Sequence, residues 1–429
     1  MFFRSLLVRS SIMKIGTKQL RNFKVLFLLA VAFTMMEAKQ KSYKGYSIIR
    51  ALPRNDQDIK YLADFRSTTT EYVFLQDGIS RESVDILSPP IYNIFLKAKL
   101  SWAGIPHKVL MSNVQKIIDK APTTEPGGTM GWTSYHRLQD IFDWMDELAA
   151  ANTFVKIEII GQSHEGRDLK VLKINTANSP VKFWIDGGIH AREWITPATV
   201  TYIINEMVNN YEANKDIVDA YQWHFLPVHN PDGYEYSHTN DRLWRKTRQN
   251  HNSPSGCIGA DPNRNWDFHW MEPGASGNKC SEIYAGPSPF SEPCARLVAD
   301  YILRLNQDKS LLAFVTIHSY SQLWMTPFGY NETYPENYAD MERVGRKGMD
   351  ALTASYGTVY QFGITSTTIY ITSGSSSDWA YGVAKVPYVY ALELRDTGEL
   401  GFLLPEDQII PTAKETWFGI KAAAKEILA

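Results

Sequence analysis

Four side chains able to bind a metal or move a proton stand beside apolar runs in this chain of 429 residues. His190 and Glu193 follow the run 181–186, and His318 ends the run 311–317. A His-x-x-Glu pair alone is a weak signal, but imidazole nitrogens and a carboxylate oxygen are zinc ligands at about 2.0–2.2 Å. If the two strand ends meet, the three residues predict a zinc site.

The fourth side chain, Glu393, lies inside the apolar run 388–394. A carboxylate in an apolar strand is costly unless it is paired or functional. Two interpretations stay open from the residues alone. Glu393 either forms a salt bridge, for example with Arg395, or acts as a general base beside the metal site.

Buried strands must position these residues. The nearly continuous apolar runs 182–185, 311–317 and 388–394 are typical of strands buried on both faces. Amphipathic helical patterns alternate with them, the first over 138–148 with Ser134 as its predicted N-cap. This alternation predicts one α/β domain with a mixed, largely parallel sheet flanked by helices. Ligands of such sheets lie at the carboxyl ends of the strands.

A smaller α+β domain is predicted over residues 41–118. It combines strand-like runs with amphipathic helical runs; the strands are 46–52, 71–75, 84–87 and 108–111, and the helices are 56–65 and 91–102. Residues 119–130 have prolines and glycines but no apolar periodicity, which predicts a linker open to proteolysis. The large domain then covers 131–429.

The N-terminus has the pattern of a secretory signal peptide. Arg21 and Lys24 precede the apolar run 25–36, which is shorter than the roughly 20 residues that span a bilayer. We therefore expect a signal peptide over 1–38, a secreted extracellular protein and no membrane association after its removal; a short membrane anchor is the alternative. The formal net charge of -2 gives no indication of a nucleic-acid partner.

The chain has three cysteines, which cannot all pair with one another. Cys257 and Cys280 flank a polar stretch, and secretion favours a disulfide between them. Cys294 opens a helical pattern and is expected to be a buried free thiol. Asn331 begins the single glycosylation sequon, whose occupancy the sequence leaves open.

These motifs together resemble the pancreatic-type zinc carboxypeptidases, the carboxypeptidase A/B family. The resemblance rests on His190-x-x-Glu193, 230–234, 242–248, 263–266, 316–320, Tyr370 and 393–398. Residues 44–118 also resemble the inhibitory propeptide of that family, with 45–53 matching its opening strand. The resemblance implies a zymogen with a carboxypeptidase-like fold, preceded by a small α+β ferredoxin-like propeptide domain.

The resemblance also implies the catalytic roles. His190, Glu193 and His318 would bind one Zn²⁺ per chain. Glu393 would be the general base, and Arg245 would stabilise the oxyanion that develops in the reaction. The substrates would be the C-termini of peptides and proteins, from which single residues are removed.

Further positions match residues that hold the substrate. Asn263 and Arg264 match a clamp for the terminal carboxylate, because an arginine can bind a carboxylate through two hydrogen bonds. Asp261 would orient His190. The other implied substrate-binding residues are Tyr370, which closes over the end of the substrate, and Arg192, Tyr320 and Phe402 of an upstream subsite.

The preferred C-terminal residue depends on the floor of the specificity pocket. Basic-specific members have an acid at the position of Ser377, which is neutral here, and Gly329 is a second uncharged wall position. We therefore expect an A-type preference for apolar or aromatic residues. Asp378 leaves a B-type or mixed preference open, because a one-residue shift would place its carboxylate in the pocket.

Lys116 and Lys120 predict activation by a trypsin-like protease between 116 and 130. An alternative from another class is a catalytically silent, carboxypeptidase-like binding protein. Such proteins usually lose a zinc ligand or the base, whereas every one of these residues is present here.

Overall fold

The computed structural model describes residues 40–76, 78, 82–120 and 127–429. The predicted signal peptide 1–38 and most of the linker lie outside these residues. By their contacts, Ser42–Ala429 form one compact unit, which is described below. Among the described residues, no helix has the length and apolar character needed to cross a membrane.

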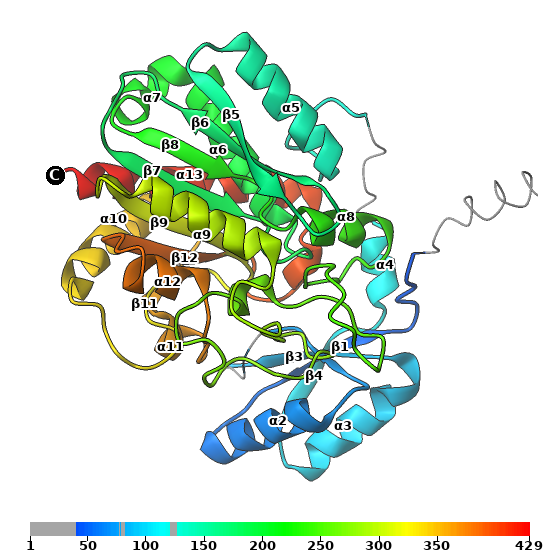
Figure 1. The fold of residues 1–429 in the computed structure, drawn as a ribbon. Coiled ribbons are helices and arrows are strands. Elements are labelled where there is room, and N and C mark those ends of the chain that lie inside the picture. The colour runs from blue at the N-terminus through cyan, green and yellow to red at the C-terminus, as the bar shows by residue number, and fades with distance from the viewer. Residues whose placement is uncertain (1–39, 77, 79–81, 121–126) are drawn as a thin grey trace, which may run out of the picture. The chain divides into compact units, whose positions relative to one another are not determined.

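The N-terminal part of this unit is a four-stranded antiparallel sheet with the strand order β2-β3-β1-β4 and two main helices on one face (Figure 1). This is the ferredoxin-like arrangement, and it confirms the predicted α+β fold. The elements are β1 (Ser47–Ala51), α2 (Asp56–Thr68), β2 (Val73–Phe74), β3 (Val84–Ser88), η1 (Pro90–Tyr92), α3 (Asn93–Trp102), β4 (His107–Met111) and α4 (Val114–Ile118).

Strand β1 separates two apolar layers of this part. Ile49 points toward the helices, where it packs with Leu62 of α2 and Leu96 of α3. Ile48 points the other way, into a cluster that includes Tyr320 of the large part. One face of the small sheet therefore holds its own helices, while the other face lies against the rest of the protein.

The large part contains an eight-stranded mixed sheet with the order β11-β10-β12-β9-β7-β8-β6-β5 (Figure 1). The central strands β12, β9, β7 and β8 are parallel to one another, and β10, β6 and β5 are joined by antiparallel pairing, which confirms the predicted class. The strands are β5 (Val155–Gln162), β6 (Asp168–Ile174), β7 (Lys182–Gly187), β8 (Gln222–Leu226), β9 (Leu311–Ser319), β10 (Leu323–Thr326), β11 (Gln361–Ile364) and β12 (Tyr388–Leu394).

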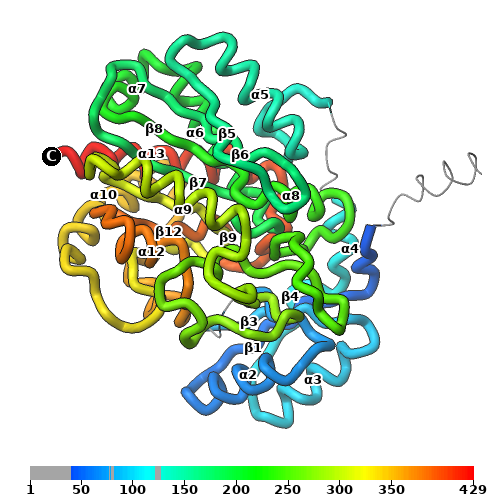
Figure 2. The backbone as a smooth tube through the Cα atoms, in the orientation of Figure 1, coloured from blue at the N-terminus to red at the C-terminus, as the bar shows by residue number. Residues whose placement is uncertain are grey.

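Helices cover both faces of this sheet, and the chain can be followed between them in Figure 2. Buried residues of α6, α10 and α13 share one core with Phe183 and Ile185 of β7, while those of α9 and α12 share another with Trp184. The helices are α5 (Leu138–Ala151), α6 (Ile195–Asn209), α7 (Tyr211–Val218), α8 (Pro231–Thr239), η2 (Pro262–Arg264), α9 (Pro293–Leu305), α10 (Tyr338–Tyr356), α11 (Thr365–Thr368), α12 (Ser376–Gly382), η3 (Gly401–Leu403), η4 (Glu406–Gln408) and α13 (Ile409–Ile427).

The first helix of the large part begins at the first residue of the predicted helical pattern, but its N-cap differs from the predicted one. It begins at Leu138 with Arg137 as its N-cap, so Ser134 is not the cap. Tyr135 is buried instead, and its hydroxyl donates to the carbonyl of Leu404 at 2.9 Å. This tertiary contact holds the chain outside the helix at the point where local capping chemistry favours a helix start.

The parallel strands β7, β9 and β12 are neighbours, and they place the predicted metal-binding and catalytic residues at one edge of the sheet. Gly187 at the end of β7 is in register with Ile317 of β9, and His318 of β9 is in register with Glu393 of β12. The carboxyl ends of these strands therefore lie side by side, although they are far apart in the sequence.

Candidate zinc centre and substrate cleft

A sharp turn after β7 carries the first two predicted ligands. Gly188 has a φ of 66°, and a Cβ there would lie 3.0 Å from Pro197 and 3.3 Å from the carbonyl oxygen of Pro227. Glycine is the residue that adopts this conformation without strain and leaves room for its neighbours. The turn places His190 and Glu193 at the sheet edge, beside His318.

His190, Glu193 and His318 form a buried cluster whose possible ligand atoms all lie within 4.8 Å of one another. Nδ1 of His190 lies 2.8 Å from Oε1 of Glu193 and 3.2 Å from Nδ1 of His318, which in turn lies 3.4 Å from Oε2 of Glu193. Two nitrogen ligands of a tetrahedral zinc ion are about 3.3 Å apart. The donor set and its spacing therefore fit zinc.

Hydrogen bonds behind the cluster orient both imidazoles. Nε2 of His190 lies 3.1 Å from Oδ1 of Asp261, and Nε2 of His318 lies 3.5 Å from Oγ1 of Thr316, whose hydroxyl donates to Asp186 at 2.9 Å. A proton on each Nε2 satisfies these contacts and leaves each Nδ1 lone pair for a metal. Such partners fix the tautomer of metal-binding histidines.

The charges around the cluster keep its carboxylates ionised. Burial raises the pKa of Glu193, but the neighbouring imidazoles of His190 and His318 outweigh burial and hold it at about 2. Burial likewise raises the pKa of Asp261, but the guanidinium groups of Arg245 and Arg264 hold it well below its usual range. Glu193 is therefore an anionic ligand at neutral pH.

The predicted base and the predicted oxyanion cation lie on two sides of the cluster. Glu393 belongs to β12, the strand beside His318, and its side chain lines the same cleft as Glu193 and Arg245. The Arg245 side chain is almost fully buried, and its Nη2 donates to Oδ2 of Asp261 at 2.7 Å. Arg395, offered above as a salt-bridge partner for Glu393, pairs with Glu415 through Nε at 2.7 Å.

The predicted carboxylate clamp lies on η2. Nε of Arg264 donates to the carbonyl of Gly274 at 2.8 Å, and its Nη1 donates to the carbonyl of Asn263 at 2.8 Å. Oδ1 of Asn263 accepts from the backbone N–H of Ser376 at 2.9 Å, the residue before Ser377. The clamp is thereby joined to the helix that carries the predicted specificity position.

Ser377 and Asp378 differ in what their side chains contact. The Ser377 hydroxyl lies 3.3 Å from that of Ser375 and is buried. Both carboxylate oxygens of Asp378 accept from the N–H of Gly329 at 2.9 Å. Burial raises the pKa of Asp378 to about 7, against the lowering effect of these backbone bonds. The Asp378 carboxylate is therefore used to hold the 329–330 backbone.

Arg192, Tyr320 and Phe402 form one cluster beside the cleft, and we call these three residues and Tyr370 the rim. The Arg192 guanidinium carbon lies 4.4 Å from the Phe402 ring centroid, and the Tyr320 and Phe402 rings are 4.9 Å apart. Tyr370 lines the same cleft as Tyr320 and Phe402. The structure thus brings all four predicted rim residues to one side of the metal cluster.

The small domain contacts this rim. Nη2 of Arg192 donates to the carbonyl of Leu75 at 2.9 Å, and the Tyr320 hydroxyl donates to Asp85 at 2.8 Å. Gly78 packs so closely on Tyr370 that a Cβ there would lie 2.2 Å from the tyrosine ring. In this form of the protein, segments of the small domain contact three of the residues that were predicted to bind substrate.

The sequence did not indicate several partners of the predicted residues. Glu282 accepts from Arg192 at 3.0 Å, and Asp186 and Thr316 support His318. Asp85 binds Tyr320 from another domain. No spacing or motif marks these residues, because each pair is made by the tertiary fold.

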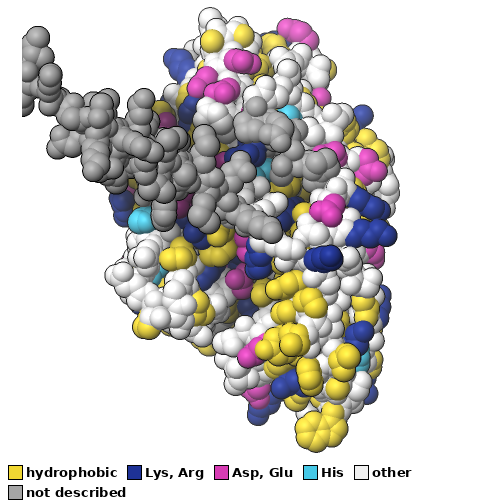
Figure 3. Space-filling model, turned by 90° about the vertical axis from the view of Figure 1, so that its right-hand side faces the viewer, with side chains coloured by type: hydrophobic (Ala, Val, Ile, Leu, Met, Phe, Trp, Pro, Cys, Tyr) yellow, Lys and Arg dark blue, Asp and Glu magenta, His cyan; other side chains and the backbone are white. Residues whose placement is uncertain are grey.

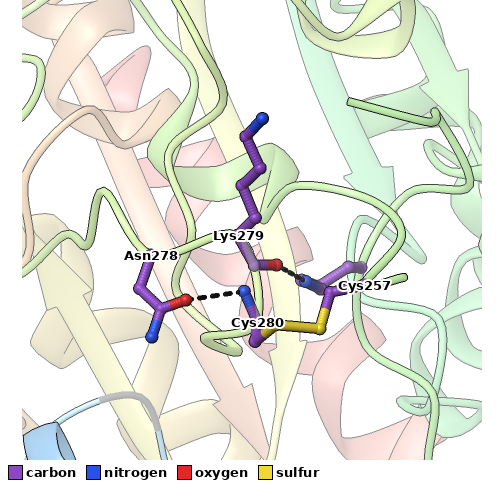
Figure 4. Close-up of a disulfide and its surroundings, with 5 residues drawn as sticks. Cys257, Asn278, Lys279 and Cys280 are labelled. Atoms are coloured by element: carbon purple, nitrogen blue, oxygen red, sulfur yellow. Dashed lines mark hydrogen bonds between the residues drawn. A yellow bond between two sulfur atoms is a disulfide. The ribbon is translucent and has the colours of Figure 1, made fainter. Parts of the chain in front are cut away.

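Cys257 and Cys280 form the expected disulfide, at a separation of 23 residues (Figure 4). Beside the disulfide, the N–H of Cys280 donates to Oδ1 of Asn278 at 3.0 Å. Cys294 is a buried free thiol in α9, as expected, and burial raises its pKa.

Comparison with known proteins finds carboxypeptidase matches over most of the chain. Residues 141–419 match the zinc carboxypeptidase family, and residues 49–121 match the carboxypeptidase activation peptide. "Carboxypeptidase B" of Astacus astacus is 51% identical over 298 residues, which cover 69% of this chain and 97% of that protein. "Carboxypeptidase A2" of Rattus norvegicus is 37% identical over 401 residues, 90% of this chain and 95% of that protein.

A solved structure extends the likeness to both domains. The crystal structure of thrombin activatable fibrinolysis inhibitor has a TM-score of 0.81 and 31% identity, covering 90% of this chain and 99% of that chain. The matched activation peptide implies that proteolysis activates the enzyme. With its metal cluster, its fold and both matched regions, the chain belongs to the zinc carboxypeptidase family, enzymes that hydrolyse the C-terminal peptide bond of their substrates.

Proposed function

We propose that this protein is a secreted procarboxypeptidase that binds one Zn²⁺ per chain through His190, Glu193 and His318. The signal peptide is 1–38, the inhibitory propeptide is 41–118, the activation linker is 119–130 and the catalytic domain is 131–429. The observation that carries the proposal is the meeting of three ligand side chains at parallel strand ends, beside the strand that carries Glu393.

In the proposed mechanism, zinc supplies Lewis-acid polarisation of the scissile carbonyl and activates a water molecule. Glu393 takes a proton from the attacking water and delivers it to the leaving amine. Arg245, fixed by Asp261 through the bond at 2.7 Å, faces the oxygen on which negative charge develops. Because Asp261 contacts both His190 and Arg245, one buried carboxylate orients both sides of the reaction centre.

Asn263 and Arg264 hold the terminal carboxylate of the substrate in this proposal, which makes the enzyme an exopeptidase. The backbone bonds of Arg264 support this role, because they hold its guanidinium in one orientation. Tyr370 closes over the end of the substrate. Arg192, Tyr320 and Phe402 bind the upstream residues once the propeptide has left.

For the terminal residue we propose an A-type preference, for apolar or aromatic side chains. The neutral Ser377 and the engagement of the Asp378 carboxylate with backbone N–H groups support it, because a buried lysine or arginine would lack a free counter-charge. The name of the Astacus relative, "Carboxypeptidase B", favours B-type specificity as the second candidate. Turnover of matched peptides ending in phenylalanine and in arginine distinguishes the two.

A trypsin-like protease is the proposed activator. Lys120 is exposed and follows helix α4, whereas Lys116 lies within that helix. Proteases cleave extended, accessible segments, so Lys120 is the better site of the two. N-terminal sequencing of the trypsin-treated protein identifies the cleaved bond.

The test of the whole proposal uses the purified zymogen and its trypsin-treated form. We expect one zinc ion per chain before and after trypsin, and peptide hydrolysis only after it. Glu393→Gln should keep the zinc and lose turnover by about 100- to 10,000-fold. Glu147→Gln, an exposed position on α5, is the matched control.

Full activity of Glu393→Gln would remove Glu393 from the mechanism. A zinc-loaded, trypsin-treated protein that hydrolyses none of a broad set of peptides would instead support the silent binding protein.

A further inference from the structure

Helix α3 of the propeptide presents large apolar side chains to solvent. Trp102 is 94% exposed, Ile94 is 78% exposed and Ile91 is 73% exposed, and Phe95 beside them is 63% exposed. The spacing of Ile94, Phe95 and Trp102 places them on one side of α3, and Ile91 lies in η1, directly before the helix. We call these four residues, Ile91, Ile94, Phe95 and Trp102, the α3 face. Figure 3 shows hydrophobic side chains gathered over this end of the molecule, with both basic (Lys, Arg) and acidic (Asp, Glu) side chains beside them.

The α3 face is not needed for packing within the chain. The opposite side of the helix supplies Leu96 and Leu100, both fully buried in the propeptide core. The inhibitory contacts come from the other face of the sheet, where Ile48 packs toward Tyr320. The propeptide therefore folds through the buried side of α3 and contacts the catalytic domain through the opposite face of its sheet. Neither of these contacts involves the α3 face.

Lysines outnumber acids around the α3 face, where Glu71 is the acid that lines the same notch as Phe95 and Lys99. Residues 89–111 contain Lys97, Lys99 and Lys108 but no aspartate or glutamate, and all three lysines are exposed. Glu71 lies across the notch between α2 and α3, where its carboxylate accepts from the hydroxyls of Thr69 and Thr70 at 3.0 and 3.2 Å. An exposed apolar stripe flanked by lysines is complementary to a lipid surface, which has an apolar interior and can have anionic headgroups.

We propose that the α3 face binds anionic lipid surfaces in the zymogen. Tryptophan, phenylalanine and isoleucine side chains on a lysine-flanked helix enter the boundary between headgroups and acyl chains. Nearby lysines gain from the negative potential of anionic lipids. Cleavage and loss of the propeptide, which belong to the proposed function, would then release the mature enzyme from the surface.

A second copy of the chain is a poorer partner for this surface. In a symmetric dimer the same patch meets itself, so the lysines of one copy would face the lysines of the other. Segment 89–111 supplies no carboxylate to pair with them. Anionic lipid headgroups supply that negative charge, and the 94% exposure of Trp102 suits insertion better than a flat protein contact.

The experiment is co-sedimentation of the intact, secreted zymogen with vesicles. The vesicles are phosphatidylcholine alone or phosphatidylcholine with about one third phosphatidylserine. We expect binding to the anionic vesicles, at least tenfold weaker binding to the neutral ones, and weakening with added salt. The trypsin-activated enzyme, separated from its propeptide, should remain in the supernatant.

Matched variants connect binding to the α3 face. Phe95→Ser with Trp102→Ser should reduce binding to anionic vesicles at least tenfold, whereas Val359→Ser, an exposed apolar position of the catalytic domain, should not. Lys97→Gln with Lys99→Gln should remove the preference for anionic vesicles, and Lys347→Gln should keep it. Circular dichroism of each uncleaved variant, and its lack of peptidase activity before trypsin treatment, verify that the propeptide is folded.

Several outcomes would overturn the proposal. They are absence of binding to anionic vesicles, equal binding to both kinds of vesicle, and wild-type binding by the Phe95→Ser, Trp102→Ser variant. A zymogen dimer in sedimentation equilibrium that these two substitutions dissociate would assign the face to a second copy instead. None of these results depends on peptidase activity, so the proposed function can stand or fall separately.

Discussion

Asp85 of the propeptide is the best place to test how the zymogen is held inactive. Its buried carboxylate accepts from Nε and Nη2 of Arg50, each at 2.7 Å, and from the hydroxyl of Tyr320 at 2.8 Å. Nη2 of Arg50 also donates to the carbonyl of Gly398 at 3.1 Å. Asp85 thus binds the catalytic domain directly through Tyr320 and indirectly through the arginine it positions.

Asp85→Asn keeps the shape of the side chain but removes its charge. One oxygen of the Asp85 carboxylate accepts from both Nη2 of Arg50 and the Tyr320 hydroxyl, and the other accepts from Nε of Arg50. An asparagine can place its amide oxygen at only one of these two positions, and its amide nitrogen cannot accept at the other, so at least one bond to the Arg50 guanidinium is lost. A hydrogen bond to a charged group contributes about 1.5–3 kcal/mol. At about 1.4 kcal/mol for each factor of ten, the cleaved propeptide should dissociate about 10- to 100-fold more readily.

The assay follows peptidase activity of the trypsin-cleaved zymogen over a dilution series. The midpoint of the rise in specific activity gives the dissociation constant of the bound propeptide. Because residue 85 is removed with the propeptide, the mature enzyme is identical in both proteins and provides an internal control. Asp64→Asn, on the exposed side of α2, is the control for charge loss alone.

Thermal unfolding of the uncleaved zymogen, followed by circular dichroism, separates a weaker contact from an unfolded propeptide. If Asp85→Asn has a folded propeptide and the same dissociation constant as the unaltered protein, the charge-assisted contacts of the Asp85 carboxylate do not hold the enzyme inactive.

Three further predictions concern the catalytic domain. Asp261→Ala should weaken zinc binding about 10- to 100-fold, measured by competition with a chelator, because His190 loses its orienting partner. Arg264→Ala should lower kcat/KM for peptides with a free carboxylate by at least tenfold; if the unaltered enzyme cleaved amidated peptides equally well, the clamp would be wrong. Replacing Cys257 and Cys280 by serine should lower the free energy of unfolding by about 3 kcal/mol, because the disulfide closes a loop of intermediate length. Urea titration measures this change, and an unchanged midpoint would show that other contacts hold the loop.

The sequence was sufficient to predict the site residues that lie at the ends of buried strands. The runs 182–185, 311–317 and 388–394 were readable as buried strands, and strands buried on both faces are predominantly parallel neighbours. Since parallel strands end at one edge, His190, Glu193, His318 and Glu393 had to lie near one another. The structure places them so, with His318 and Glu393 in register.

Contacts between separate segments could not be predicted from spacing. Asp85 reaches Tyr320 across 235 positions and Arg192 reaches Leu75 across 117, and no periodicity records such pairs. The N-cap of α5 was wrong for the same reason: Ser134 is a good local cap, but the buried contact of Tyr135 with Leu404 holds that segment outside the helix.

The distribution of these contacts bears on how activation works. The groups that orient the metal cluster, Asp261 behind His190 and Thr316 behind His318, belong to the catalytic domain. The propeptide bonds described here reach Arg192, Tyr320 and the carbonyl of Gly398, and none of these three bonds involves Asp261 or Thr316. Removing the propeptide would therefore free Arg192 and Tyr320, the groups proposed to bind substrate, and would leave Asp261 and Thr316 behind the proposed zinc ligands in place. We therefore expect activation to require release of the propeptide but no rebuilding of the hydrogen bonds behind those ligands.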